Sequence, residues 1–332
     1  MQRILVLGGT GWLGRETASA WARRGAEVVC LARGVTGPVP DGVRLVVADR
    51  TQPGAYDGLG GDWDAVVELA APPALVEGAL GALADRAAHW TLVSSVSVYA
   101  RTDERGADES AELVTPTDPS DYAHAKVLAE QASTARLGDR LLIARPGLIV
   151  GPGDPSDRFG YWPARLMRGG TVLLPEPAGR WVQAIDVADL AEWIVSAGAG
   201  GLTGTVDAVG PSTPFEEFLA AVRSATGFDG EFAPRSDEWL REHGIDHWAG
   251  PRSLPLSLPR PDTAFARRSG AAYRASGGVF RPLSDTVERV LSDEIARGLG
   301  RARRSGLARE VEREALGALH PDRVRSPSSL NE

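Results

Sequence analysis

The sequence predicts an α/β fold, in which a doubly wound parallel sheet is followed by a smaller, mostly helical C-terminal part. Three observations support this prediction. Short apolar runs alternate with helical stretches through the first half of the chain, a glycine-rich turn follows the first run, and the alternation fades near Gly151. Apolar strands that alternate with helices form βαβ units, whose parallel sheet is covered on both faces.

The glycine-rich turn, residues 8–14, follows the apolar run Ile4 to Leu7 and precedes a predicted helix. We expect Gly8 to permit a tight turn, Gly11 to let the backbone approach a pyrophosphate, and Gly14 to let the helix pack closely on the strand. The helix N-terminus offers free N–H groups and the positive end of its dipole to the phosphates. The turn therefore predicts a Rossmann-type dinucleotide-binding domain. Cofactor contacts are expected from Gly8, Thr10, Gly11, Trp12, Leu13 and Gly14.

The later apolar runs predict further strands of the same sheet. These strands are Ala26 to Ala32, Val43 to Ala48, Ala65 to Ala70, Trp90 to Ser95 and Leu141 to Ala144. Helical spacing predicts helices at Arg15 to Arg24, Leu75 to Ala88, Asp121 to Arg136, Leu283 to Gly298 and Arg301 to Leu319. Because such sheets bind ligands at the carboxyl ends of their strands, we expect the functional site along that edge.

The change in composition divides the chain into two predicted parts. Residues 1–150 are expected to form the dinucleotide-binding domain, to which 181–210 return as a strand, a helix and a strand. Residues 151–180 and 211–320 are expected to form the substrate-binding portion. The remaining residues, 321–332, are expected to be a flexible tail.

The composition limits the classes of function. A net charge of −8 over 332 residues argues against binding to nucleic acid or to an acidic membrane surface. No apolar run approaches about 18 residues, and the first strand begins almost at Met1, so we expect neither a membrane span nor a signal peptide. Cys30 is the only cysteine, which leaves no intrachain disulfide. His243 and His247 have no companion ligands, so no metal is expected. A cytoplasmic protein is the expectation from these features together.

A serine, a tyrosine and a lysine supply the predicted chemistry. Ser95 ends a strand, and Tyr122 and Lys126 lie four residues apart on one face of a helix. A free phenol has a pKa near ~10, and a neighbouring ammonium lowers that value by favouring the phenolate. With a serine hydroxyl to hold the substrate oxygen, this set suits proton transfer at a carbonyl while a hydride moves at carbon. The alternative is a simple surface pair of Tyr and Lys.

These motifs together resemble the extended short-chain dehydrogenase/reductases of the NAD(P)-dependent epimerase/dehydratase superfamily. The matching segments are GGTGWLG at 8–14, Asp49, ELAA at 68–71, SSVSVY at 94–99, YAHAK at 122–126 and RPG at 145–147. The second half resembles the bacterial isoflavone-reductase-like branch through DRF at 157–159, YW at 161–162 and RGG at 168–170.

The resemblance implies roles for these residues. Ser95 would be catalytic, Tyr122 would be the general acid/base, and Lys126 would bind the nicotinamide ribose hydroxyls and lower the pKa of Tyr122. Asp49 would reach the adenine. The other cofactor contacts implied are Leu69, Ala70, Ala71, Ser94 and Pro146. The family also commonly forms homodimers, here through the two helices predicted at 75–88 and 121–136.

The predicted cofactor is NADP, with NAD as the alternative. In NAD-binding relatives an acid at the end of the second strand holds the ribose 2′-hydroxyl, and here that place falls at about Ala32. Arg33 follows at once and can meet a 2′-phosphate through its planar fork, with help from Arg15 or Arg50.

The substrate is expected to be a small, largely apolar carbonyl compound, cyclic or aromatic, rather than a nucleotide sugar. Nucleotide-sugar members carry an Asn where this chain has Leu148, but they also carry an Arg that is kept here as Arg180. Aromatic residues of the second half offer flat surfaces suited to ring-shaped ligands. Substrate contacts are expected from Ser97, Tyr161, Trp162 and Trp181.

Three functions stay open on the sequence. The leading one is an NADP-dependent oxidoreductase that reduces the carbonyl of a small metabolite or oxidises the alcohol. The second is a nucleotide-sugar epimerase or dehydratase, in which the cofactor is recycled on the enzyme. The third is a non-catalytic dinucleotide-sensing protein, which would have no need of a proton-transfer set such as Ser95, Tyr122 and Lys126.

Overall fold

The computed structural model describes residues 1–317 and divides the chain into two compact units. Unit 1 comprises residues 1–151, 183–212 and 264–282, and unit 2 comprises 152–182, 213–263 and the chain from 283 onward. The structure also assigns residues 264–282 to the first unit, which the prediction did not. This segment contributes no strand to the sheet, so the alternation of strands and helices could not reveal it. The predicted tail, 321–332, lies outside the described residues.

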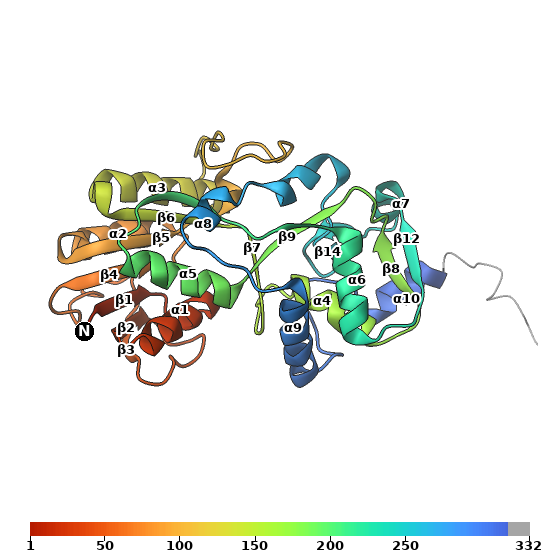
Figure 1. Cartoon of the computed structure of the whole chain (residues 1–332), viewed down its shortest axis with the longest axis horizontal. Helices are drawn as coiled ribbons and strands as arrows, with labels where there is room; N and C mark the ends of the chain where they lie inside the picture. Colours follow the sequence, from red (N-terminus) through yellow and green to blue (C-terminus); the bar gives the residue numbers. More distant parts are fainter. Residues whose placement is uncertain (318–332) are drawn as a thin grey trace, which may run out of the picture. The chain divides into compact units, whose positions relative to one another are not determined.

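Unit 1 is built on a parallel sheet with the strand order β10-β6-β5-β4-β1-β2-β3 (Figure 1). Its strands are β1 (Arg3–Leu7), β2 (Glu27–Ala32), β3 (Arg44–Val47), β4 (Trp63–Glu68), β5 (Ala87–Val93), β6 (Leu141–Pro146) and β10 (Gly204–Ala208). Ile4 of β1 pairs with Val28 of β2 on one side and with Ala65 of β4 on the other. The strand order reverses at β1, so the carboxyl ends of β1 and β4 form a topological switch point. The prediction of a doubly wound parallel sheet is confirmed.

Helices cover both faces of this sheet (Figure 1). Its flanking helices are α1 (Trp12–Arg23), α2 (Pro73–Leu83), α3 (Tyr122–Leu137) and α5 (Val187–Ala199). The central strands are apolar on both sides because both sides are buried. Ile4 belongs to one core cluster with Ala18 of α1, whereas Leu5 belongs to another with Val76 of α2. Unit 1 also holds β7 (Leu148–Val150), which pairs with β9 (Trp181–Asp186), and the short helix α8 (Ala271–Ala275).

Unit 2 is smaller and consists mainly of helices with short paired strands. Its elements are α4 (Arg158–Leu166), β8 (Val172–Pro175), α6 (Phe215–Thr226), β12 (Phe232–Arg235), α7 (Asp237–Glu242), β13 (Asp246–Trp248), β14 (Ser253–Pro255), α9 (Leu283–Arg297) and α10 (Arg309–Gly317). The division between the units falls within the strand β11 (Ser212–Pro214): Ser212 belongs to unit 1, and the next two residues belong to unit 2. Within unit 2, β12 pairs with β8 and β13 with β14.

Some predicted bounds differ from the structure. The helix predicted over 75–88 ends at Leu83, and the 3₁₀ turn 84–86 leads into β5 at Ala87. The mix of alanines and polar residues between Leu83 and Trp90 fits either a helix or a strand, so the pattern did not separate the two. The helix predicted from Arg301 begins only at Arg309. Within residues 1–317, every helix is too short or too polar to span a lipid bilayer.

Aromatic side chains form the core of unit 2. Tyr161 and Trp162 on α4 are only 2% and 0% exposed. The Trp162 ring packs edge-on against Tyr161 and Phe215, with centroids 5.1 and 5.5 Å away. Its indole N–H donates a 2.8 Å hydrogen bond to the Pro255 carbonyl. The expectation that Tyr161 and Trp162 contact substrate is therefore corrected: α4 is buried along almost its whole length, so both side chains are part of the core.

We expect Trp162→Ala to lower the free energy of unfolding by about 3–5 kcal/mol, because it leaves a cavity and an unpaired carbonyl in the core. Urea titration followed by far-UV circular dichroism measures this change. A loss below about 1 kcal/mol, typical of a surface substitution, would contradict the core assignment.

Candidate active site

The glycine-rich turn has the backbone that a pyrophosphate site needs. Gly8 has a φ of 96°, in the left-handed region, and its N–H donates to the Leu31 carbonyl at 2.9 Å. A Cβ at Gly14 would lie only 2.4 Å from the Gly8 carbonyl oxygen, so the helix and the turn are packed in direct backbone contact. Gly11 is the N-cap of α1 and brings no side chain to it. The start of α1 therefore carries no capping side chain from Gly11, and a helix N-terminus of this kind favours an anion.

The end of β2 carries the residues predicted to choose the cofactor. Ala32 is the last residue of the strand, and Arg33 follows it with an exposed side chain. Asp49, beyond the end of β3, accepts hydrogen bonds from the Thr51 amide at 3.0 Å and hydroxyl at 2.8 Å. These bonds, together with the Arg33 charge, hold the pKa of Asp49 below its ordinary value. An arginine and an ionised carboxylate thus lie beyond neighbouring strands.

Arg50, which was expected to help bind a 2′-phosphate, instead pairs with a buried carboxylate. Its guanidinium forms a buried ion pair with Glu68 and also donates to the Leu75 carbonyl at 2.7 Å and the Tyr56 hydroxyl at 3.1 Å. These bonds occupy the guanidinium inside unit 1, which corrects the idea that Arg50 assists at a 2′-phosphate. Arg15 binds the carbonyls of the turn and of the loop after β2 through Nη1.

The predicted proton-transfer residues lie at the carboxyl edge of the sheet. Tyr122 is the first residue of α3 and is 51% exposed, so its phenol is open to a reactant. Asp121 caps the start of this helix: its carboxylate accepts hydrogen bonds from the backbone amides of residues 123 and 124, at 2.8 and 3.0 Å. Ser95 lies two residues beyond β5, where its hydroxyl donates to that of Ser97 at 3.1 Å.

Lys126 is buried one turn further along α3, with 3% of its surface exposed. Its ammonium donates to the Val93 carbonyl at the end of β5, at 2.6 Å, and to the Ala70 carbonyl beyond β4, at 2.9 Å. The ammonium lies 6.0 Å from the centroid of the Tyr122 ring. Burial lowers the pKa of Lys126 to about 8. Tyr122 and Lys126 are thus brought together at the ends of two neighbouring strands.

A buried ion pair lies next to this lysine, and sequence reasoning missed it. Glu130 accepts a 2.5 Å hydrogen bond from the Ser94 hydroxyl and is gripped by Arg145, whose Nε and Nη2 donate at 2.9 and 2.6 Å. Arg145 also donates to the hydroxyl of Tyr99 at 2.8 Å. The spacing of Lys126 and Glu130, four residues on one helix, was the signal that could have found it.

The network continues to the segment 264–282 within unit 1. The hydroxyl of Tyr99 donates to Asp207 at 2.6 Å, and Asp207 in turn binds Arg268. The Tyr99 ring has the guanidinium carbons of Arg145 and Arg268 at 5.0 and 3.4 Å from its centroid. This network fixes the turn after Ser95 because Tyr99 follows it directly.

In unit 2, Arg180, the arginine that this chain shares with nucleotide-sugar members, already has all three guanidinium nitrogens bonded. Arg180 is 1% exposed, and its three nitrogens bind the Glu176 carbonyl, the Leu258 carbonyl and the Asp237 carboxylate. The neighbouring Trp181 is only partly buried. Of the expected substrate contacts in unit 2, Trp181 alone retains an accessible surface.

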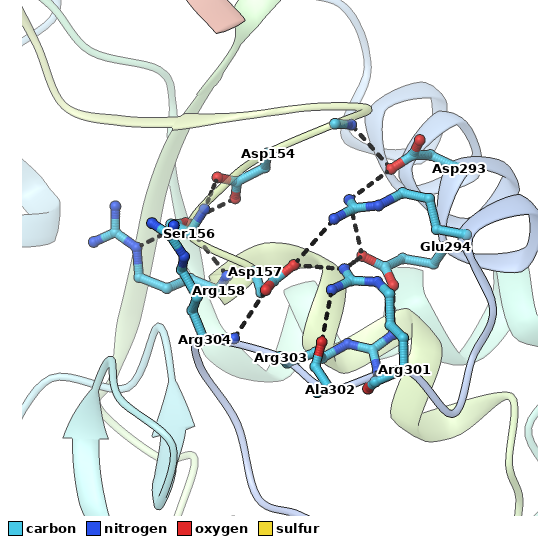
Figure 2. Close-up of polar contacts among 12 residues, drawn as sticks. Asp154, Ser156, Asp157, Arg158, Asp293, Glu294, Arg301, Ala302, Arg303 and Arg304 are labelled. Atoms are coloured by element: carbon cyan, nitrogen blue, oxygen red, sulfur yellow. Dashed lines mark hydrogen bonds and ion pairs between the residues drawn. The ribbon is translucent and has the colours of Figure 1, made fainter. Parts of the chain in front are cut away.

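Asp157, in the segment that resembles the isoflavone-reductase-like branch, holds loops of unit 2 together (Figure 2). Its carboxylate accepts from Arg301 at 2.5 Å and from the Arg304 amide at 2.9 Å, and Arg301 also binds Glu294 of α9 at 2.8 Å. These bonds join the loop before α4 to α9 and to the chain after it. These bonds give Asp157 a structural role. The resemblance to the isoflavone-reductase-like branch stays a prediction.

The remaining sequence candidates also have structural partners. Cys30 is buried in β2, and burial raises the pKa of its thiol to about 12, so it is unsuited to act as a nucleophile. His243 stacks on Trp239 with a centroid distance of 3.7 Å. His247 binds the Ser257 hydroxyl at 3.0 Å and lies 3.4 Å from Asp237.

Comparison with known proteins identifies the family. The profile of the NAD dependent epimerase/dehydratase family matches residues 4–85 and 75–206. The chain is 32% identical over 219 residues to dTDP-4-dehydrorhamnose reductase from Streptomyces griseus, covering 62% of this chain and 68% of that protein. It is 30% identical over 258 residues to 2′-dehydrokanamycin reductase from Streptomyces kanamyceticus, covering 72% and 71%. The chain belongs to the NAD dependent epimerase/dehydratase family and is an NAD(P)-dependent enzyme of the short-chain dehydrogenase/reductase type.

Solved structures share this fold. UDP-N-acetylglucosamine 4-epimerase from Bacillus cereus superposes with a TM-score of 0.66 at 18% identity, over 90% of this chain and 97% of that one. RMD from Pseudomonas aeruginosa, complexed with NADPH, superposes with a TM-score of 0.63 at 18% identity, over 90% and 100%. The likeness confirms the extended short-chain dehydrogenase/reductase fold.

We expect Gly14→Ala to lower the free energy of unfolding by about 1–3 kcal/mol, because the new methyl group would press on the Gly8 carbonyl. Urea titration measures the change. Gly81→Ala is a matched control: Gly81 lies on α2 with no atom within 4 Å of an added Cβ, and it should gain about 0.5–1 kcal/mol. Equal stability of Gly14→Ala and the wild type would contradict the backbone contact.

Proposed function

We propose that this chain is an NADP(H)-dependent reductase that converts a ketone on a cyclic, saccharide-type metabolite to the alcohol. The observation that carries the proposal is the pairing of an exposed phenol, Tyr122, with a buried ammonium, Lys126, at the edge where β4 and β5 end. An accessible proton donor beside a fixed positive charge suits reduction of a carbonyl.

The residues at this edge fit an NADP cofactor. The first N–H groups of α1 face the place for the pyrophosphate, and Arg33 supplies a planar cation for the 2′-phosphate. Lys126 uses two of its three N–H donors on backbone carbonyls, which leaves one for a ribose hydroxyl. Asp49 is proposed to reach the adenine, with NAD as the alternative cofactor. When bound, NADPH supplies the hydride.

The side chains of the site divide the remaining work. The Ser95 hydroxyl donates a hydrogen bond to the ketone oxygen and holds it beside Tyr122. Tyr122 gives its proton to that oxygen as negative charge develops there, and Lys126 stabilises the resulting phenolate. In the oxidative direction the same phenolate takes the proton back.

The proposed substrate is a saccharide-type ketone without a nucleoside diphosphate. Both relatives are named as reductases of dehydro compounds, one carrying dTDP and the other derived from kanamycin. Leu148 offers no donor to a diphosphate, and every nitrogen of Arg180 is already bonded. The burial of Tyr161 and Trp162 removes the main support for an aromatic substrate. Ser97 and Trp181 remain proposed substrate contacts.

Nucleotide-sugar chemistry, by epimerisation, dehydration or reduction, is the second candidate. It is favoured by the dTDP-bearing relative and by the fold shared with a UDP-sugar epimerase. A panel of keto-aminoglycosides, free keto-sugars, cyclic ketones and dTDP- or UDP-sugars separates the two. NADPH consumption with the first two groups supports the proposal. Turnover confined to simple cyclic ketones would contradict the saccharide-type substrate, and turnover confined to nucleotide sugars supports the second candidate. We further propose a homodimer through α2 and α3, as the family resemblance implies.

We expect Tyr122→Phe to reduce kcat with the best ketone by about 100-fold or more, because it removes the general acid but keeps the ring. NADPH binding, measured by fluorescence titration, should stay within about twofold of the wild-type value because the phenol is not needed for it. Turnover close to that of the wild type would show that protonation occurs elsewhere.

We expect Arg33→Ser to weaken NADPH binding by about 10-fold or more and to leave NADH binding unchanged, because a charge-assisted bond to the 2′-phosphate is lost. Isothermal titration with both nucleotides measures the effect. Arg44→Ser removes an exposed arginine from the amino end of β3 and serves as the control. Equal losses for NADPH and NADH would refute the role of Arg33.

A further inference from the structure

Lys126 is the only lysine in the chain, and the other 35 of the 36 Lys and Arg residues are arginines. Its ammonium binds only two backbone carbonyls, and among residues 1–317 no carboxylate lies within hydrogen-bonding distance of it. A buried ammonium without a direct counter-ion tends to lose its proton, whereas a guanidinium would keep it. If Lys126 is to keep its proton, charges that do not bind the ammonium directly must favour the protonated form.

Two buried ion pairs are tied to the same strand ends as Lys126. Glu68 pairs with Arg50 and accepts from the amide of Ala70 at 2.8 Å, and the carbonyl of Ala70 accepts from Lys126. Glu130 pairs with Arg145 and accepts a hydrogen bond from the Ser94 hydroxyl. The carbonyl of Val93, the residue before Ser94, accepts from Lys126. Each of the two carbonyls that the lysine binds therefore belongs to a short segment that a buried carboxylate also binds.

The carboxylates act on Lys126 through space. Glu68 and Glu130 both raise its pKa, in opposition to burial, which is the larger effect. Their side chains are 0% and 5% exposed, so water screens these charges little. The other groups near the ammonium are the Tyr122 phenol and, beyond the carboxylates, the guanidiniums of Arg50 and Arg145. Each ion pair thus contributes a buried carboxylate whose charge favours the protonated lysine.

We propose that Glu68 and Glu130 are positioning residues that keep the Lys126 ammonium protonated at neutral pH, and that Arg50 and Arg145 hold them in place. The catalytic consequence rests on the proposed function: Lys126 can lower the pKa of Tyr122 only while it carries its charge. The effect on the charge of Lys126 itself does not depend on what the substrate is.

The single lysine allows a direct test. In protein labelled with carbon-13 lysine, the Cε resonance of Lys126 reports its protonation, and we expect a wild-type midpoint near pH 8. Glu130→Gln and Glu68→Gln should each lower the midpoint by about 0.5–1 pH unit, because each removes a negative charge near the ammonium. Glu312→Gln, which breaks the buried pair with Arg165 in unit 2, should leave the midpoint unchanged.

A double variant separates charge from folding. Glu130→Gln with Arg145→Gln leaves no charge unpaired, so we expect its midpoint to lie between those of the wild type and Glu130→Gln. If neither single variant folds, this double variant still tests the proposal, because its Lys126 midpoint must fall below the wild-type value. An unchanged midpoint in a folded variant that lacks Glu68 or Glu130 would overturn the proposal.

The pH profile of turnover tests the link to catalysis. Ketone reduction needs the protonated phenol and the protonated lysine together, so its alkaline limb should move to lower pH in Glu130→Gln along with the resonance. A shifted resonance in an enzyme that reduces no ketone would leave the charge inference standing and refute the proposed function. Ketone reduction with an unshifted resonance would refute the inference and leave the function standing.

Discussion

The ammonium of Lys126 joins three elements of unit 1 at one point. It projects from α3 and binds the carbonyl of Val93 at the end of β5 and that of Ala70 just beyond β4, so this one side chain ties the helix to two neighbouring strands. That attachment places Tyr122, one turn earlier, at the open carboxyl edge. Because a buried charge is costly unless it is compensated, the ion pairs of Glu68 and Glu130 follow from the same requirement.

The buried network extends this requirement across unit 1. Glu130 binds Ser94 and Arg145, and Arg145 binds Tyr99, whose backbone ends the turn that begins with Ser95. The site is thus held by side chains whose bonds are nearly all satisfied, and such networks tend to be rigid. Rigid support is what a proton donor needs, since small displacements of a reacting group are costly in rate.

The sequence could predict those features whose cause is local. The turn at 8–14, the apolar strands and the spacing of Tyr122 and Lys126 each depend on a few neighbouring residues, and the structure has these elements where they were expected. Arg50 was misjudged because its partner, Glu68, lies on another strand. The network that reaches Arg268 could not be foreseen, because its members come together only through the folded sheet. Tyr161 and Trp162 were misjudged for a related reason: their Gly- and Pro-rich surroundings suggested an open loop, whereas α4 is buried.

The fate of deuterium from NADPH deuterated at C4 tests the central claim most directly. If the Tyr122 site reduces a ketone, mass spectrometry should find one deuterium per product molecule, on the carbinol carbon, with one NADPH consumed. Tyr122→Phe should slow this transfer by about 100-fold or more. If the enzyme instead recycles a bound cofactor, product should form without net NADPH consumption and without deuterium from the added nucleotide. That second result would contradict the account of this protein as a net reductase.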